Sequence, residues 1–142
     1  MPLPEARRTI AQQSALLREA QHAASHAYAP YSAFRVGAAL LLADGNIVSG
    51  ANVENASYGL TMCAERSAVV RAVAEHGPTM RIAAVAVANL NGASSSPCGA
   101  CRQVLAEFML PGGLVLFPAD GVTQCSTLTA LLPYSFGLPH GE

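Results

Sequence analysis

Three cysteines limit how this chain can fold, because they must come together in space if they bind one metal ion. Cys63 begins a Cys-Ala-Glu triplet, and Cys98 and Cys101 lie in a Pro-Cys-Gly-Ala-Cys segment that is distant in the sequence. Both segments must meet in space to share an ion. Three sulfur ligands leave one tetrahedral position of Zn²⁺ open for water, as in catalytic zinc sites, whereas a fourth protein ligand closes a structural site. The pattern predicts a catalytic zinc site, with Glu65 beside it as a proton carrier.

The pair Cys98 and Cys101 alone does not distinguish a metal site from a thiol–disulfide pair, because both use a Cys-x-x-Cys spacing. Cys63 favours the metal, since a redox pair needs no third cysteine. The first residues lack the apolar segment of a secretory signal, so we expect a cytoplasmic protein whose cysteines do not form disulfides. Cys125 has no motif around it, and we expect it to be a buried, small apolar residue.

The composition predicts a protein that associates with itself. Hydrophobic residues make up 51% of the chain and charged residues 12%, compared with about 25% charged residues in typical soluble domains. A membrane span needs about 18 consecutive apolar residues, and no such stretch is present. We therefore expect a homo-oligomer without a membrane segment. The formal net charge of −1 and the absence of a basic run also argue against binding to nucleic acid.

The order of predicted elements indicates an α/β protein. Helical spacing, apolar runs and turn residues predict helices at 9–27, 63–76, about 101–108 and 128–132, and strands at 34–42, 47–48, 82–88, 114–117 and 122–125. Pro111, Gly112 and Gly113 are expected to end the third helix. The alternation predicts one domain, residues 1–142, with a three-layer α/β/α sandwich around one mixed sheet of about five strands. Its seven-residue apolar run at 82–88 indicates a central strand covered on both faces.

Both cysteine motifs fall where an extended segment leads into a helix. The sulfur atoms are therefore expected near two helix N-termini at one end of the sheet, where ligands bind in α/β folds. The helix dipoles would offset the net −1 charge of three thiolates on Zn²⁺. Arg66 is expected to donate a hydrogen bond to a ligand sulfur, with a solvated helix-face charge as the alternative. For Glu65 the alternative is a carboxylate that interacts only with the helix dipole. We find no fourth ligand among the histidines.

Read with their flanks, these motifs resemble the small cytidine deaminases of pyrimidine nucleoside salvage. The resemblance covers four blocks in order, residues 31–39, 52–58, 63–66 and 97–104, and it ends near residues 131–136. The Cys-x-Glu and Pro-Cys-x-x-Cys pattern is that of zinc deaminases. It implies a cytidine-deaminase-like fold, one Zn²⁺ per subunit on the three cysteines, and Glu65 as general acid and base.

The resemblance also implies residues that contact the substrate. Asn52 and Glu54 match residues that hydrogen-bond the ribose 3′-hydroxyl, Phe34 matches an aromatic residue that packs on the pyrimidine, and Ala64 matches a substrate-binding position. Phe136 matches a residue that reaches into a neighbouring subunit's site, as in homotetrameric family members. The tail that follows Phe136 departs from the Phe-Gly-Pro and acidic residues often seen. Without the family, the favoured interpretation of Phe34 is a strand core residue, that of Phe136 a core residue near the terminus, and that of Asn52 a turn former.

The implied reaction is the hydrolysis of cytidine, and of 2′-deoxycytidine, to uridine or deoxyuridine and ammonia. Glu65 would take a proton from zinc-bound water, the resulting hydroxide would attack C4, and Glu65 would protonate N3 and then the leaving amine. Three alternatives stay open: a sister deaminase of another aminopyrimidine such as a blasticidin-type antibiotic, a thiol oxidoreductase that uses Cys98 and Cys101, and a non-catalytic zinc module. The Asn52 and Glu54 pair argues against the first alternative.

Overall fold

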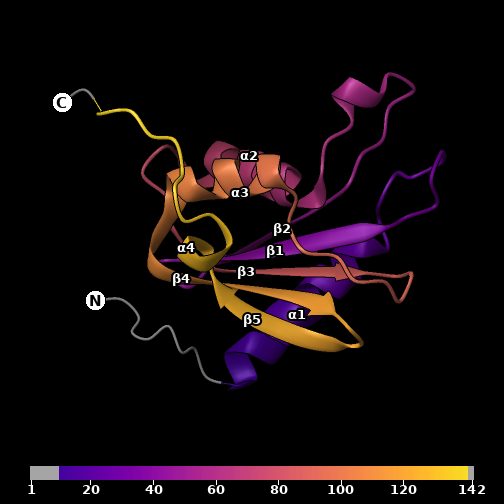
Figure 1. Ribbon diagram of the computed structural model, residues 1–142, viewed down its shortest axis with the longest axis horizontal. Coiled ribbons are helices and arrows are strands. Elements are labelled where there is room, and N and C mark those ends of the chain that lie inside the picture. The colour runs from indigo at the N-terminus through magenta and orange to yellow at the C-terminus, as the bar shows by residue number, and fades with distance from the viewer. Residues whose placement is uncertain (1–9, 141–142) are drawn as a thin grey trace.

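The computed structural model describes residues 10–140 of the 142-residue chain, and Figure 1 shows its elements. The start predicted for the first helix, Thr9, lies outside the described residues. The elements in chain order are α1 (Ile10–Ala24), β1 (Val36–Leu42), β2 (Ile47–Ala51), the 3₁₀ turn η2 (Tyr58–Leu60), α2 (Ala64–His76), β3 (Ile82–Asn89), α3 (Gly99–Phe108), β4 (Met109–Ala119), β5 (Val122–Thr127) and α4 (Leu128–Leu131).

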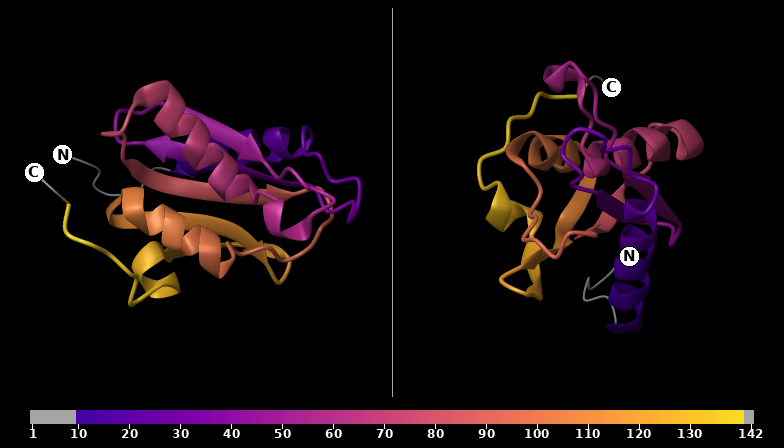
Figure 2. Two further views of the ribbon diagram at one scale, coloured as in Figure 1. Left: turned by 90° about the horizontal axis from the view of Figure 1, so that it is seen from above. Right: turned by 90° about the vertical axis from the view of Figure 1, so that its right-hand side faces the viewer.

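The strands form one five-stranded sheet in the order β2-β1-β3-β4-β5. The pair β3 and β4 is parallel, and the other neighbouring pairs are antiparallel. Figure 1 shows α1 on one face of the sheet and α2 with α3 on the other, and Figure 2 shows α2 and α3 side by side over that face. The sequence-based prediction of a three-layer α/β/α fold with a mixed sheet is therefore confirmed.

Alternate residues of the strands fill two separate cores. In β1, Leu40 and Leu42 pack in the cluster that includes α2 and α3, whereas Leu41 packs with Leu16 of α1. All eight residues of β3 are buried, and β3 is the third strand of the five. The prediction that the apolar run at 82–88 forms a central, doubly covered strand is confirmed.

Two glycines allow the helices to approach the sheet closely. A Cβ atom at Gly37 of β1 would lie 2.0 Å from the carbonyl oxygen of Ala20 in α1, and one at Gly50 of β2 would lie 2.4 Å from the backbone nitrogen of Ala68 in α2. Real Cβ atoms do not approach backbone atoms this closely. The backbones of α1 and α2 therefore rest against the sheet at positions where only glycine fits.

The first helix is shorter than predicted. It ends at Ala24 rather than at residue 27, and the next residues form turns. Tyr28 then leaves the helix to exchange backbone hydrogen bonds with the segment after β2: its N–H donates to the Asn52 carbonyl, and its own carbonyl accepts from the Glu54 N–H. These long-range bonds replace the helical pattern.

The expectation that residues 111–113 end the third helix was wrong. The helix α3 already ends at Phe108, and residues 111–113 lie within β4. The register of β4 against β3 shifts between Met109 and Leu114, so the intervening residues form a bulge. Gly112 has a φ of 78°, which glycine adopts without strain.

Cys125 is exposed, so the expectation that it is buried was also wrong. It lies on the edge strand β5 opposite Leu116 of β4, and Leu116 faces the α1 side of the sheet. The helix α1 packs on β1, β2 and β3. An edge strand outside the area covered by a helix leaves this side chain open to solvent.

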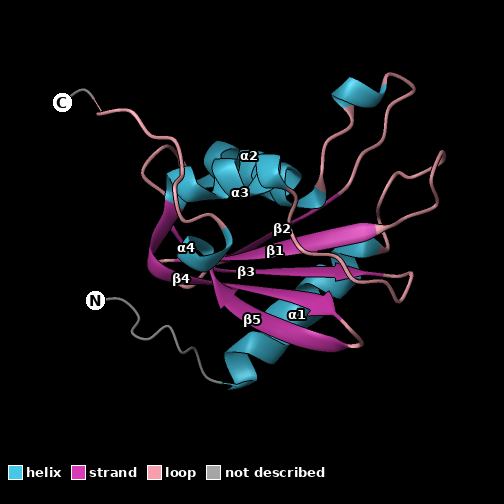
Figure 3. Cartoon of the chain, in the orientation of Figure 1, coloured by secondary structure: helices cyan, strands magenta, loops and turns pink. Residues whose placement is uncertain are grey.

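The strand directions bring the starts of α2 and α3 to the same end of the sheet. Both β2 and β3 run antiparallel to β1, so their carboxyl ends lie at the same end of the sheet. The helix α2 follows β2, and α3 follows β3. Figure 3 shows that the long loop before β1 and the long loop before α2, which contains η2, also lie at this end of the sheet.

Candidate metal centre

The three predicted ligands come together at the two helix starts. Cys63 is the N-cap residue of α2, Cys98 is the N-cap residue of α3, and Cys101 lies in the first turn of α3. Their Sγ atoms all lie within 4.8 Å of one another, and those of Cys63 and Cys98 are 4.0 Å apart. Zn–S bonds of 2.3 Å in tetrahedral geometry place the sulfur atoms about 3.8 Å apart. The donor set and its spacing therefore fit a zinc ion.

An ion bound to the three sulfur atoms would have one coordination position left for water. Within residues 10–140, no histidine, aspartate, glutamate or further cysteine joins the group of three sulfur atoms. His22 and His26 pair with each other, with ring centroids 5.1 Å apart, and the His140 imidazole contacts Glu107 at 3.1 Å. A tetrahedral ion on three thiolates would keep the open site that catalytic zinc requires.

Hydrogen bonds support thiolates at the centre. The Arg66 Nη2 atom donates to the Cys63 Sγ atom at 3.2 Å, and the backbone N–H of Cys101 donates to the Cys98 Sγ atom at 3.4 Å. The pKa of Cys63 is lowered to about 5, first by the hydrogen bond from the Cys101 thiol and then by Arg66. The pKa of Cys101 is raised, because the neighbouring Cys63 takes the negative charge and Cys101 is buried. The environment therefore favours a charged sulfur even before metal binds.

Glu65 lies in the first turn of α2, next to Cys63, and is only 5% exposed. Burial raises the pKa of Glu65, and the negative charge of Cys63 raises it further. Hydrogen bonds from the backbone N–H of Glu65 and from Cys101 oppose this shift. A buried carboxyl group with a raised pKa beside a metal site can both accept and return a proton.

Asn52 has a structural task in this chain. Its side chain is buried, with Oδ1 accepting from the Val36 N–H and Nδ2 donating to the Phe34 carbonyl, both at 2.9 Å. These bonds fix the start of β1 to the end of β2. One N–H of the Asn52 amide is not used in them.

Glu54 holds the loop before β1. Its Oε1 atom accepts from the backbone N–H groups of Tyr31 and Ser32 at 2.9 and 3.2 Å, and its Oε2 atom contacts the Ser32 hydroxyl. The Ser32 hydroxyl first, and the two N–H groups after it, lower the pKa of Glu54. Glu54 also lines a small cavity of about 160 Å³ together with Tyr58.

The remaining predicted contact residues differ in accessibility. Phe34 is half-buried against the core on the α2 side, and the Ala64 side chain is fully buried in that core. The whole Ala64 residue is 0% exposed, and its backbone N–H is among those at a helix start without an intrahelical partner. Phe136 is 69% exposed and lies in the segment after α4.

Two side chains of α3 make contacts that were not predicted from the sequence. The Gln103 side chain binds the backbone of Phe136, and the Arg102 guanidinium binds the backbone at Pro97 and Leu131. Both residues directly follow the second cysteine motif. The sequence did show two polar side chains just after the start of a helix with predicted metal ligands. Their partners at Leu131 and Phe136 could not be inferred, because these residues are distant in the sequence.

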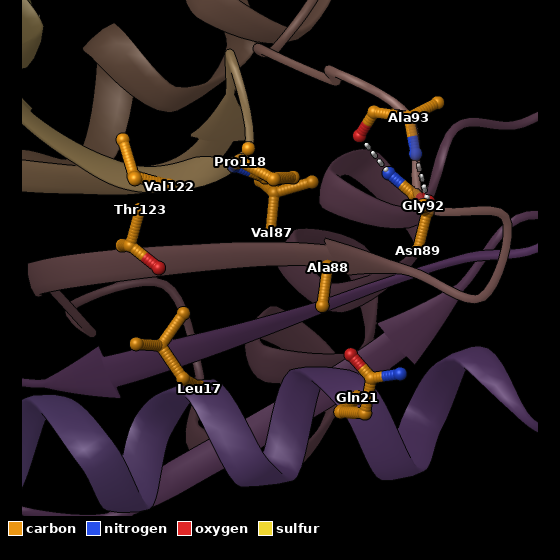
Figure 4. A pocket seen from close by; sticks show the side chains of 11 residues that line it. Leu17, Gln21, Val87, Ala88, Asn89, Gly92, Ala93, Pro118, Val122 and Thr123 are labelled. Carbon is orange, nitrogen blue, oxygen red and sulfur yellow. Dashed lines mark hydrogen bonds between the residues drawn. The ribbon is translucent and has the colours of Figure 1, made fainter.

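A larger cavity of about 360 Å³ contains none of the predicted site residues. Figure 4 shows it between α1, which contributes Leu17 and Gln21, and the β4–β5 hairpin, which contributes Thr123. At its rim, Asn89 bonds the backbone of Ala93 through both side-chain polar atoms. No cysteine lines this cavity, so it is separate from the metal centre.

Comparisons with known proteins agree with this geometry. Residues 10–115 match the family described as the cytidine and deoxycytidylate deaminase zinc-binding region. The chain is 46% identical over 123 residues to a cytidine deaminase from Halalkalibacterium halodurans, which covers 85% of this chain and 91% of the relative. It is 50% identical over 119 residues to a cytidine deaminase from Mycobacterium tuberculosis, with 84% and 85% covered.

Solved structures lead to the same family. The crystal structure of a cytidine deaminase from Burkholderia pseudomallei superposes with a TM-score of 0.78 at 44% identity, over 87% of this chain and 98% of that one. The crystal structure of the Mycobacterium tuberculosis enzyme gives a TM-score of 0.76 at 43% identity, over 89% of this chain and 98% of that one.

Within residues 10–140, no helix has the length and apolar character needed to cross a membrane. The prediction of zinc on Cys63, Cys98 and Cys101 is confirmed by the family match and the sulfur geometry together. This chain belongs to the cytidine and deoxycytidylate deaminase zinc-binding family.

Proposed function

We propose that this chain hydrolyses cytidine and 2′-deoxycytidine to uridine or deoxyuridine and ammonia, in the salvage of pyrimidine nucleosides. The observation that carries the proposal is the group of three sulfur donors, without a fourth protein donor among the described residues, next to the buried carboxyl group of Glu65. Relatives named as cytidine deaminases are 46% and 50% identical to the chain. A closed structural zinc module would need a fourth protein ligand, and the described residues supply none.

Cys63, Cys98 and Cys101 would hold one zinc ion per chain. When bound, zinc lowers the pKa of a coordinated water toward neutrality. Arg66 offsets part of the negative charge of three thiolates through its bond to the Cys63 sulfur, and the N-termini of α2 and α3 add about half a positive charge each.

Glu65 carries the protons in this proposal. Its carboxylate accepts a proton from water as the water oxygen adds to C4 of the pyrimidine, and it delivers that proton to N3. Glu65 then takes the proton of the new C4 hydroxyl group and passes it to the amine. The C4–N bond breaks as the C4 carbonyl forms, and the amine leaves as ammonia. The burial of Glu65 supports this role, because burial raises its pKa and a general acid and base works best with a pKa near the operating pH.

The nucleoside would be held by residues at the end of the sheet where the three cysteines lie. The free N–H of the Asn52 amide and the Glu54 carboxylate would bind the ribose 3′-hydroxyl, the Phe34 ring would pack on the pyrimidine, and the Ala64 N–H would bind a polar atom of the base. The hydrogen bonds that Asn52 and Glu54 make to the backbone support this proposal, since they hold both side chains in one orientation before substrate arrives.

Self-association as a homotetramer in the cytoplasm completes the proposal, with residues 1–142 as one catalytic domain. Exposed apolar side chains support it, since monomers expose few large apolar patches. Tyr58 is 83% exposed and Leu60 is 70% exposed in the loop before α2, and Phe136 is exposed near the C-terminus. Phe136 would enter the site of a neighbouring subunit.

The test is ammonia and uridine production by purified protein of known zinc content, with cytidine, deoxycytidine and free cytosine compared. Turnover of both nucleosides but not of the free base, with about one zinc per chain as one open site requires, is the expected result. Zinc without nucleoside turnover would overturn the substrate assignment in favour of another aminopyrimidine, such as a blasticidin-type antibiotic. Protein that binds no zinc would overturn the mechanism in favour of thiol–disulfide chemistry.

A further inference from the structure

We propose that Arg102 is a positioning residue of the metal centre, whose guanidinium fixes the peptide group before the ligand Cys98. The inference rests on the zinc chemistry of the proposed function. It assigns Arg102 no contact with metal or substrate. Its action is on the peptide group before Cys98.

Arg102 binds the carbonyl oxygens on both sides of Cys98. Its Nε atom donates to the Pro97 carbonyl oxygen at 2.8 Å, and its backbone N–H donates to the Cys98 carbonyl oxygen at 2.9 Å. The second bond is a helical backbone bond that any residue at this position makes, so only the bond to Pro97 depends on the arginine side chain. The two bonds limit the backbone rotations of Cys98 that would move its sulfur.

Little packing surrounds the Cys98 side chain, although Pro97 before it is buried. Cys101 is buried and Cys63 is half-buried, whereas Cys98 is exposed. Its neighbours Gly99 and Ala100 are also exposed. The position of this sulfur therefore depends on hydrogen bonds more than those of the other two ligands do.

The Arg102 guanidinium is itself anchored elsewhere in the fold. Its Nη1 atom donates to the Leu131 carbonyl oxygen at 2.8 Å, at the end of α4, and its Nη2 atom contacts the Ser96 hydroxyl at 3.3 Å. Each of the three nitrogen atoms thus has a different acceptor. A lysine offers one nitrogen atom and cannot reproduce this planar fork, so Arg102→Lys keeps the charge and removes the geometry.

Arg81 provides a matched control. Its Nη1 atom also donates to two backbone carbonyl oxygens, those of Pro78 and Met80 at 3.2 and 2.7 Å. Arg81 directly precedes β3, so it lies at the end of the sheet opposite the metal centre. Arg81→Lys therefore tests the loss of an arginine bonded to backbone without a change near Cys98.

The experiment measures zinc release from the purified, zinc-loaded proteins to a chromogenic chelator, together with the unfolding free energy of each metal-free protein. We expect Arg102→Lys to release zinc at least about tenfold faster than the unaltered protein, the lower end of the range for residues that orient metal ligands. Arg81→Lys should release zinc at the unaltered rate. In Co²⁺-loaded protein, the sulfur-to-cobalt absorption band should change in Arg102→Lys and not in Arg81→Lys.

Equal release rates and equal cobalt spectra in Arg102→Lys and the unaltered protein would overturn the inference and leave the proposed function intact. Faster release that is matched by Arg81→Lys would also overturn it, because the effect would then be one of general stability. An unaltered protein without zinc would overturn the proposed function instead. If Arg102→Lys does not fold, Ser96→Ala removes one anchor of the guanidinium and should still accelerate zinc release, and an unchanged rate there would overturn the inference.

Discussion

The side-chain amide of Gln103 in α3 pairs with the backbone of Phe136 through two hydrogen bonds. Its Nε2 atom donates to the Phe136 carbonyl oxygen at 2.8 Å, and its Oε1 atom accepts from the Phe136 N–H at 3.1 Å. The pair ties the segment after α4 to the helix that carries two zinc ligands. The Phe136 ring stays exposed while its backbone is held in place.

We expect Gln103→Ala to release this segment. Hydrogen exchange at the Phe136 amide should become faster, because that N–H loses its acceptor, and KM for cytidine should rise more than kcat falls. Gln103→Glu is the control: it keeps an oxygen acceptor for the Phe136 N–H and removes the donor to the carbonyl. Equal protection of the Phe136 amide in Gln103→Ala and the unaltered protein would show that the pair does not hold the tail.

Glu65→Gln should separate proton transfer from metal binding. The amide has nearly the shape of the carboxyl group but cannot accept and return a proton at neutral pH. We expect zinc content and thermal stability to be kept and kcat to fall by about 10³-fold, within the range for general acid–base catalysis. The measurement is steady-state deamination by protein of known zinc content. Retained activity in the zinc-loaded variant would exclude Glu65 from this role.

Cys98→Ala should lose zinc and stability together, because ligand binding contributes to folding free energy. Zinc affinity should fall by more than the roughly 10- to 100-fold typical of residues behind the ligands. Metal titration and thermal denaturation with and without zinc measure both effects. Cys125→Ala is the matched control, since Cys125 is exposed on the edge strand and should be neutral in both assays. Tight binding of one zinc by Cys98→Ala would contradict the ligand assignment.

Gly37→Ala should destabilise the fold through the contact between α1 and the sheet, on the face opposite α2 and α3. The added Cβ atom would lie 2.0 Å from the Ala20 carbonyl oxygen, so α1 must move away from β1. We expect a loss of about 3 kcal/mol in the free energy of unfolding, as in overpacked cores. Gly59→Ala is the control, because a Cβ atom there meets nothing within 4 Å. Chemical denaturation of both variants provides the comparison, and equal stability would contradict the close helix–sheet contact.

Glu54→Gln should reveal the pH dependence of the loop before β1. The Ser32 hydroxyl and the backbone N–H groups of Tyr31 and Ser32 lower the pKa of Glu54 below its ordinary value of 4.5. A carboxyl group whose pKa is lower in the folded state stabilises that state above the unfolded pKa, and this contribution is lost as the pH falls through the folded pKa. The unaltered protein should therefore have the higher Tm at pH 7.

The difference in Tm between the unaltered protein and Glu54→Gln should close as the pH is lowered below 4.5, because a protonated Glu54 resembles glutamine. Thermal denaturation across this range, with both proteins at the same zinc content, measures the difference. A gap that stays constant with pH would show that the carboxylate charge does not contribute.

Sequence patterns were sufficient for most of the secondary structure and for the chemistry of the zinc ligands. The apolar run at 82–88 predicted the buried central strand because a strand covered on both faces has no polar face. The motif around Cys98 predicted a helix start because its ligand spacing is local. Errors arose where distant segments compete with local preference. The first helix ends early because Tyr28 bonds the segment after β2. Residues 111–113 become a bulge within β4 because Met109 before them and Leu114 after them both pair with β3.

The sequence by itself determined which residues can bind zinc, which can carry a proton, and which segments form strands and helices, since residue chemistry and periodicity are local properties. Only the tertiary structure decided that the Cys63 and Cys98 sulfur atoms, which were expected to share an ion, lie 4.0 Å apart. It also decided that Cys125 faces solvent on an edge strand and that Gln103 holds Phe136. These relations depend on strand order and helix placement. The free energy that fixes them comes from packing between residues far apart in the chain, which no local pattern records.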